Sequence, residues 1–361
     1  MKSLRDHLLD QPLEALGAPE PQVDPAKVPR VLGLTPSGCA LAVQARWAKE
    51  NAPILVLCDS ARRLEQMRDD LECLLGEEQV CAFQGWEISP EEWTHPSEST
   101  VSSRLELFLK IRRGEPFVLL ATWSSLLGRL PRMDALLSRS FVLERGADLD
   151  PRGLSEKLLD LGFSPEPMVE EVGEFSVRGG IVDFFPYLGD QPIRVDLMGD
   201  GVESIRAFDI FSQRSTGNLE RVEILPLGEL SWPEENWELG RARIRGEHGQ
   251  RAADAAIEAL RHREGRDGLV WMRPFFLPSG GTLLDLFPER PVVFADGESA
   301  ARAKLAEARD RLASAWEAHR AAGRPVAPLP ELVAEAESVA ALLEKCRRLD
   351  FCTVDFGGGA Q

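Results

Sequence analysis

The chain has 361 residues, enough for two or three domains, and its hydrophobic fraction of 43% is ordinary for a globular protein. It contains no apolar run of about 18 residues, which excludes a membrane-spanning helix, and its formal net charge is −17. Proteins that grip DNA through its phosphates are basic, so this charge argues against strong DNA binding and favours solubility or a protein partner.

Cysteine and histidine usage indicates neither a metal site nor a catalytic centre. The first residues, Met1–His7, lack the apolar core of a secretion signal. The six cysteines fall at no metal-ligand spacing, and we interpret them as buried, reduced thiols of a cytoplasmic protein. The five histidines are scattered, and we expect them at surface or helix-capping positions. We therefore expect no metal and no cofactor.

Strand and helix patterns alternate over the first 130 residues. Apolar runs predict strands at Arg30–Leu34, Ile54–Cys58, Val80–Phe83 and Phe117–Thr122. Apolar residues at helical spacing predict two helices between these strands, over 61–75 and around 101–109. Such alternation is typical of a parallel sheet covered by helices.

The first predicted strand leads into a sequence that resembles a phosphate-binding loop. Gly33 and Gly38 have the Walker A spacing, in which the second glycine is followed by Lys and then by Ser or Thr. Here Cys39 stands in place of the lysine and Ala40 in place of the magnesium-binding hydroxyl. We interpret the loop as an inactive nucleotide site that keeps its shape, with a chance glycine turn as the alternative.

From about Phe141 the pattern changes to short strands with turn signals, after a helix at Leu154–Leu161. These strands are predicted at 174–177, 181–185, 193–197 and 202–208. Alternation along the third strand places Arg194, Asp196 and Met198 on one face. The block is therefore predicted to be α+β and antiparallel.

Beyond Leu227 the chain returns to charged helices, at 252–263 and 300–322. Pro291–Asp296 is a predicted strand that ends in an acid in the manner of a Walker B motif, although an ordinary surface acid is the alternative. A last strand is predicted at 350–354. We predict an α/β fold in which 1–140 and 228–361 form one parallel-sheet domain and 141–227 are an inserted α+β domain.

The inserted block carries the most distinctive strings of the chain. Residues 172–186 read VGEFSVRGGIVDFFP, residues 192–200 read PIRVDLMGD, and residues 203–209 read ESIRAFD. Together they resemble the UvrA-binding domain shared by UvrB and the transcription-repair coupling factor family (Mfd). The resemblance covers nearly the whole chain, most specifically residues 30–60, 81–130 and 141–228, and implies a UvrB-like fold with a degenerate P-loop.

Two departures from UvrB indicate which branch the chain resembles. UvrB keeps a complete Walker A loop and a tyrosine-rich hairpin that handles DNA, and bases stack on such aromatic faces. The matching region here, Gly85–Pro90, has no tyrosine, and the whole chain has only Tyr187. The chain therefore resembles the N-terminal UvrB-like module of the coupling factors.

The resemblance implies a UvrA-binding site at Arg178, Arg194 and Met198. Family members often carry Phe at the position of Met198, but Met is also an adaptable apolar contact. Independently of the family, arginine is well suited to bidentate pairing across an interface. The alternative is that both arginines pair within the domain, with Asp183, Asp196 or Glu174.

The resemblance also implies a function, which is to bring UvrA to a stalled RNA polymerase in transcription-coupled nucleotide excision repair. We expect this segment to be no enzyme and to bind neither DNA strongly nor membranes. The motor and polymerase-binding domains of the family are absent from the sequence, so we expect a fragment or a stand-alone homologue. A UvrB-like ATPase acting on DNA, and a structural or autoinhibitory domain of a larger motor, are the alternatives.

Overall fold

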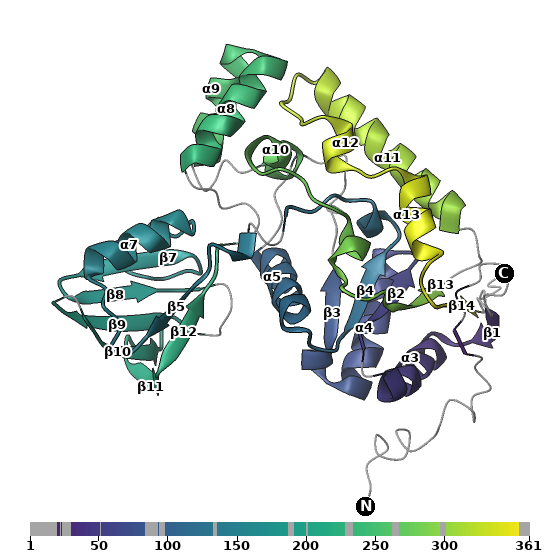
Figure 1. The fold of residues 1–361 in the computed structure, drawn as a ribbon, viewed down its shortest axis with the longest axis horizontal. Coiled ribbons are helices and arrows are strands. Elements are labelled where there is room, and N and C mark those ends of the chain that lie inside the picture. The colour runs from purple at the N-terminus through teal and green to yellow at the C-terminus, as the bar shows by residue number, and fades with distance from the viewer. Residues whose placement is uncertain are drawn as a thin grey trace, which may run out of the picture.

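The structure, a computed structural model, describes residues 20–21, 23, 30–50, 52–83, 93, 98–132, 136–186, 191–199, 201–227, 234–261, 267–296 and 301–353. Strands from the two ends of the described chain meet in one parallel sheet, and residues between 141 and 227 form separate sheets (Figure 1). Within the described residues, no helix combines the length and apolar character needed to cross a bilayer.

The parallel sheet has six strands in the order β1-β14-β13-β2-β4-β3. They are β1 (Arg30–Leu34), β2 (Ile54–Cys58), β3 (Val80–Phe83), β4 (Val118–Thr122), β13 (Val292–Asp296) and β14 (Arg348–Thr353). Every neighbouring pair is parallel. The predicted α/β class is confirmed, because strands this apolar can be buried on both faces only when helices cover both.

Helices cover the two faces of the sheet separately. On one face lie α3 (Pro36–Glu50) and α4 (Ala61–Leu75), which pack against Ile54, Val56 and Cys58 of β2. On the other face α5 (Glu98–Arg113) packs against a larger core that contains Leu55 and Leu57. The alternation along a single strand thus contributes side chains to both cores.

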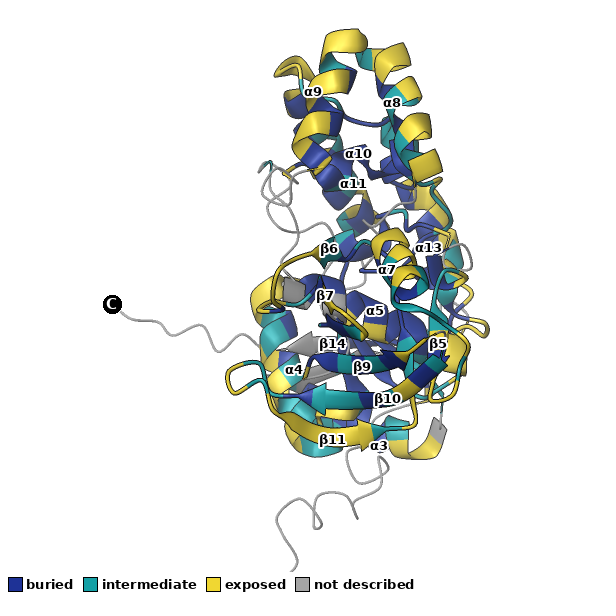
Figure 2. Ribbon diagram, turned by 90° about the vertical axis from the view of Figure 1, so that its left-hand side faces the viewer, coloured by how far each residue is buried: buried dark blue, intermediate teal, exposed yellow. Residues whose placement is uncertain are grey.

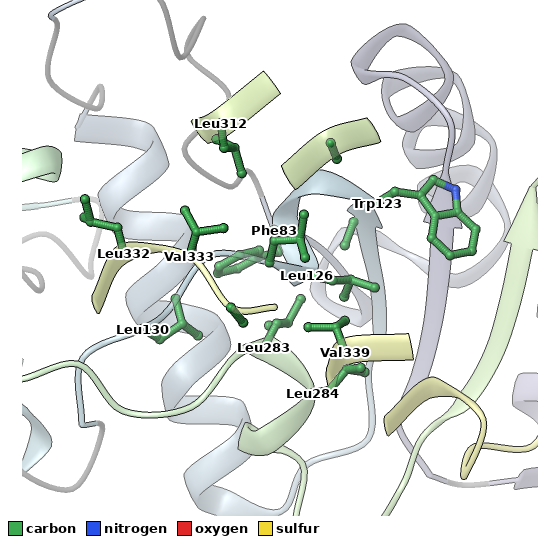
Figure 3. Close-up of a cluster of buried hydrophobic side chains, with 14 of the residues drawn as sticks. Phe83, Trp123, Leu126, Leu130, Leu283, Leu284, Leu312, Leu332, Val333 and Val339 are labelled. Atoms are coloured by element: carbon green, nitrogen blue, oxygen red, sulfur yellow. The ribbon is translucent and has the colours of Figure 1, made fainter. Parts of the chain in front are cut away.

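The larger core continues into the helical part of the chain. Its helices are α8 (Glu234–His248), α9 (Gln250–Arg261), α10 (Leu269–Phe276), α11 (Ala301–Ala321), α12 (Leu329–Leu332) and α13 (Ala336–Leu343). Figure 3 shows Phe83 of β3 beside Leu126, Leu283 and Val339 from three other segments. Helices distant in sequence are thereby joined to the sheet through one apolar cluster.

Two sequence expectations about side chains are wrong. Cys73 is exposed on α4, because the apolar face of this helix consists of Leu64, Met67 and Leu71. His319 is buried in α11, where its ring lies edge-on to Trp93 and Trp271 with centroids 5.1 and 5.0 Å away. The sequence of α11 is rich in charged residues, although one face of the helix is buried.

The inserted domain is built on a second sheet of six strands, here called the insert sheet, in the order β11-β10-β9-β8-β7-β6. Its strands are β6 (Ser164–Pro165), β7 (Glu174–Arg178), β8 (Ile181–Phe184), β9 (Ile193–Met198), β10 (Gly201–Phe208) and β11 (Ser215–Leu219). The strands from β7 to β11 run antiparallel. The edge strand β11 is exposed along most of its length (Figure 2).

One face of the insert sheet is covered by α7 (Pro151–Asp160). Leu154 and Leu158 of this helix share a core with Val182, Val195 and Ile205 of the sheet. Asp150 caps the helix by accepting a hydrogen bond from the Gly153 N–H at 2.7 Å, and Pro151 occupies its first position. The opposite face, which we call the outer face, is left for other contacts.

A short antiparallel pair, β5 (Phe141–Glu144) with β12 (Arg221–Ile224), closes the inserted domain. Among the described residues, the inserted domain contacts α5 of the rest of the chain. Leu109 of α5 packs with Leu137 and Leu225, and Arg112 and Arg113 of the same helix pair with Glu223. In the described part of the chain, α5 thus contacts the inserted domain through an apolar cluster and through Glu223, which its two arginines share.

Candidate protein-interaction site

The outer face takes its chemistry from the alternation along β9. Ile193, Val195 and Leu197 are buried on the α7 side, as the sequence predicts. Arg194 and Asp196 project from the other side, and the register pairs Arg194 with Asp183 of β8. Antiparallel pairing places directly opposed side chains within about 5.5 Å of each other, so charges on this face meet across strands.

Asp183 is the centre of a buried ionic network. Its carboxylate is 1% exposed and accepts two hydrogen bonds from Arg194, Nε to Oδ1 and Nη2 to Oδ2, each at 2.8 Å. Arg178 donates a further hydrogen bond through Nη2 to Oδ2. The hydrogen bond to Asp183 is the main cause that raises the pKa of Arg194 above its ordinary value.

The two arginines differ in how firmly they are held. The Arg194 side chain is 14% exposed, stacks over the Phe208 ring at 4.4 Å, and donates to the carbonyl and the side-chain oxygen of Gln213 at 3.1 Å. The Arg178 side chain is 47% exposed and reaches Asp183 through a single Nη2 atom. Arg194 is therefore a fixed part of the domain, and Arg178 has a solvent-facing guanidinium.

A second, more exposed pair lies beside the first. Arg206 of β10 pairs with Asp196 of β9, and the Ser204 hydroxyl donates to the same Asp196 oxygen at 2.6 Å. Both charged side chains are partly exposed. The outer face is thus a ladder of charged side chains across β8, β9 and β10, in which Arg206 lies directly opposite Arg194.

Met198 ends this ladder at the tip of the β9–β10 hairpin. It is 73% exposed. The neighbouring tip, Gly179–Gly180, follows Arg178 directly, and a Cβ at Gly180 would lie 2.5 Å from the Leu197 carbonyl oxygen. Only glycine permits this close approach of the two hairpins, which brings the Arg178 and Met198 ends of the face together.

The structure therefore brings the three predicted binding residues onto one face. The alternative of pairing within the domain is also found, because both Arg178 and Arg194 pair with Asp183. Sequence reasoning misses Gln213, which is 19 residues from Arg194 along the chain and meets it only in the folded loop.

The predicted nucleotide loop is a tight turn between β1 and α3. Gly33 lies in the strand and Gly38 in the helix, so Thr35 alone connects the two elements. The Thr35 hydroxyl accepts a hydrogen bond from the Gly38 N–H at 3.1 Å, and its carbonyl accepts one from Cys39. Thr35 thus caps the start of α3 by accepting hydrogen bonds from these two amides.

The two substituted positions of the motif face the core. Cys39 and Ala40 are both 0% exposed and pack in the apolar cluster between α3 and the sheet. Asp296 ends β13 as predicted, but its side chain lies outside the described residues, as does the hairpin region Gly85–Pro90. In the described part of the chain, no group of three or more His, Cys, Asp or Glu side chains could hold a metal ion.

Comparison with known families assigns the inserted part. The UvrB interaction domain family matches residues 141–229, the segment that carries the outer face. Residues 141–229 form a UvrB interaction domain. The ladder of Asp183, Arg194 and Arg206 thus lies within the UvrB interaction domain, on the side of its sheet that α7 leaves open.

The sequence also matches transcription-repair-coupling factors. Those of Staphylococcus aureus are 29% identical over 205 residues, which is 57% of this chain and 18% of the relative. That of Staphylococcus epidermidis is 29% identical over 194 residues, or 54% of this chain and 16% of the relative. The match thus spans less than a fifth of these relatives. With its UvrB interaction domain, the chain is similar to their N-terminal UvrB-like module.

Proposed function

We propose that this chain recruits UvrA through the outer face of its UvrB interaction domain, as a cytoplasmic component of transcription-coupled nucleotide excision repair. In a longer relative this contact would bring damage recognition to a stalled RNA polymerase. The observation that carries the proposal is the half-exposed guanidinium of Arg178 on the domain that the family match assigns to interaction.

The two arginines have different parts in this proposal. Arg178 makes a single contact with Asp183 and can turn to a carboxylate of UvrA without leaving Asp183 unpaired, because Arg194 still binds both carboxylate oxygens. Arg194 is a positioning residue, since most of its hydrogen-bonding capacity is used inside the domain. Met198 adds apolar area beside Arg178.

The binding test measures the affinity of the chain for its cognate UvrA by calorimetry. Arg178→Ala is expected to weaken binding by about tenfold to a hundredfold, the range for an interfacial charged hydrogen bond. The matched control is Arg152→Ala, an exposed arginine of α7 on the opposite side of the sheet. If the parent binds UvrA and Arg178→Ala binds equally well, the site is elsewhere. If the parent does not bind, the structural or autoinhibitory alternative is favoured.

We further propose that the segment is not an enzyme. Thr35 already occupies the amides of Gly38 and Cys39, and the side chain at the lysine position is directed into the core. The test is ATP turnover by the parent and by Cys39→Lys/Ala40→Thr. We expect neither to hydrolyse ATP, and we expect the variant to be less stable, because it buries an ammonium in an apolar cluster. Turnover by the purified parent would support the UvrB-like ATPase alternative.

A further inference from the structure

Phe211 is the most exposed of the large apolar side chains in the described part of the chain, at 94%. It lies within the UvrB interaction domain, in the loop of residues 209–214 between β10 and β11. A phenylalanine in water loses the stabilisation that its burial would give. Its place on an interaction domain makes it a candidate contact.

The loop that carries Phe211 is held in one conformation. Asp209 Oδ1 accepts a hydrogen bond from the Ser212 N–H at 2.7 Å. The Ser212 side chain, and after it this N–H, lower the pKa of Asp209 by hydrogen bonding to its carboxylate. Backbone hydrogen bonds join Gln213 N–H to the Asp209 carbonyl at 2.8 Å and Asp209 N–H to the Arg214 carbonyl at 2.9 Å. The aromatic ring is thus displayed from a closed turn.

Gln213 fastens this turn to the outer face. Its φ of 57° is in the left-handed region, which is costly for a residue with a side chain. The conformation is fixed by three contacts: Gln213 Nε2 donates to the Ile210 carbonyl at 2.9 Å, and Arg194 donates to both the carbonyl and the Oε1 of Gln213. The network centred on Asp183 therefore extends to the loop of Phe211.

Phe211 and Met198 stand at opposite ends of β9. Met198 is the last residue of that strand, and the loop begins after Phe208, whose N–H donates to the carbonyl of Pro192 just before it. From Ile193 to Met198 the strand rises by five residues, so the two ends of β9 lie about 17 Å apart. A standard interface buries about 800 Å² on each partner, so one partner can cover both ends of the face.

We infer that Phe211 is a second apolar anchor for UvrA, inserted into an apolar pocket of UvrA, while an acidic site elsewhere on the same UvrA surface meets Arg178. This inference rests on the proposed function and extends its site from the hairpin tips to the far end of β9. Because the closed turn fixes the ring before binding, little conformational entropy is lost when the ring is buried.

The test compares the affinity of cognate UvrA for the parent chain, Phe211→Ala, Phe211→Leu and Leu159→Ala. We expect Phe211→Ala to weaken binding by between about tenfold and a hundredfold, and Phe211→Leu by less, since Leu keeps part of the apolar area. Leu159 is a half-exposed apolar residue of α7, on the other side of the sheet, and its replacement is expected to leave the affinity unchanged. An unchanged melting temperature verifies that each variant is folded.

The outcomes separate this inference from the proposed function. If Arg178→Ala weakens binding and Phe211→Ala binds within twofold of the parent, the anchor is refuted and the proposed function stands. If the parent does not bind UvrA, both fall. Sedimentation of the parent and Phe211→Ala tests self-association: a dimer that Phe211→Ala dissociates without loss of UvrA affinity would assign the ring to a second copy of the chain and overturn the inference.

Discussion

Replacing Asp183 with Asn tests how much the buried ionic network stabilises the inserted domain. The change removes the charge that holds the 14%-exposed Arg194, and breaking such a buried pair from one side costs about 3 kcal/mol or more. The half-exposed Arg178 adds less than about 1 kcal/mol, because solvent screens its contact. We therefore expect the insert sheet to lose about 3 to 4 kcal/mol of local stability.

Hydrogen exchange followed by mass spectrometry measures this loss locally. A loss of 3 kcal/mol raises the rate of exchange through opening by about a hundredfold or more. Peptides covering β8 and β9 are expected to show this acceleration, and those covering β2 and β4 of the parallel sheet serve as an internal reference. Asp196→Asn is the matched control, since it breaks the more exposed pair with Arg206. Equal acceleration of less than about fivefold in both variants would refute the reasoning.

Two further predictions concern the other parts of the chain. Gly240→Ala places a Cβ 2.2 Å from the Phe276 ring and is expected to lower the free energy of unfolding by about 1 to 2 kcal/mol. Gly246→Ala on the same helix places its Cβ in open space and is expected to raise the free energy of unfolding by about 0.5 to 1 kcal/mol. Thermal unfolding compares the two variants, and equal shifts in melting temperature would contradict the packing of α8 on α10. Burial raises the pKa of Cys81 to about 11, so its thiol stays protonated at pH 8 and is expected to react with a thiol reagent at least about a hundredfold more slowly than exposed Cys73, as peptide mapping would show. Because the pKa of Cys81 is raised in the folded state, the contribution of this thiol to stability is complete below about pH 9 and is lost as the pH rises towards 11. Labelling of Cys81 and Cys73 at the same rate at pH 8 would contradict the burial of Cys81.

The parallel sheet was predictable because its strands are marked by local patterns. Continuous apolar runs define β2, β3 and β4, and the structure places β2 and β3 at the residues that the sequence indicates. The edge strand β11 is different. Ser215–Leu219 is exposed and shows no apolar alternation that would mark it as a strand. Its strand conformation depends on pairing with β10.

The candidate site was predictable only in part. Alternation along β9 identifies Arg194 and Met198 as members of one face, but it does not say which acid Arg194 meets. That choice depends on the register of β8 against β9, which aligns Asp183 with Arg194. Register is set by the apolar pattern of the opposite face together with the turn that joins the strands, so the alternation along β9 alone does not fix it.

The connections of the inserted domain have a consequence for how such chains arise. The strand that enters the domain, β5, and the strand that leaves it, β12, are paired, with Leu143 opposite Val222. A segment whose two ends emerge as neighbours occupies the space of a short loop in its host. Such a segment can be added to a host domain without rearranging the sheet that receives it, because the host chain is interrupted at a single point.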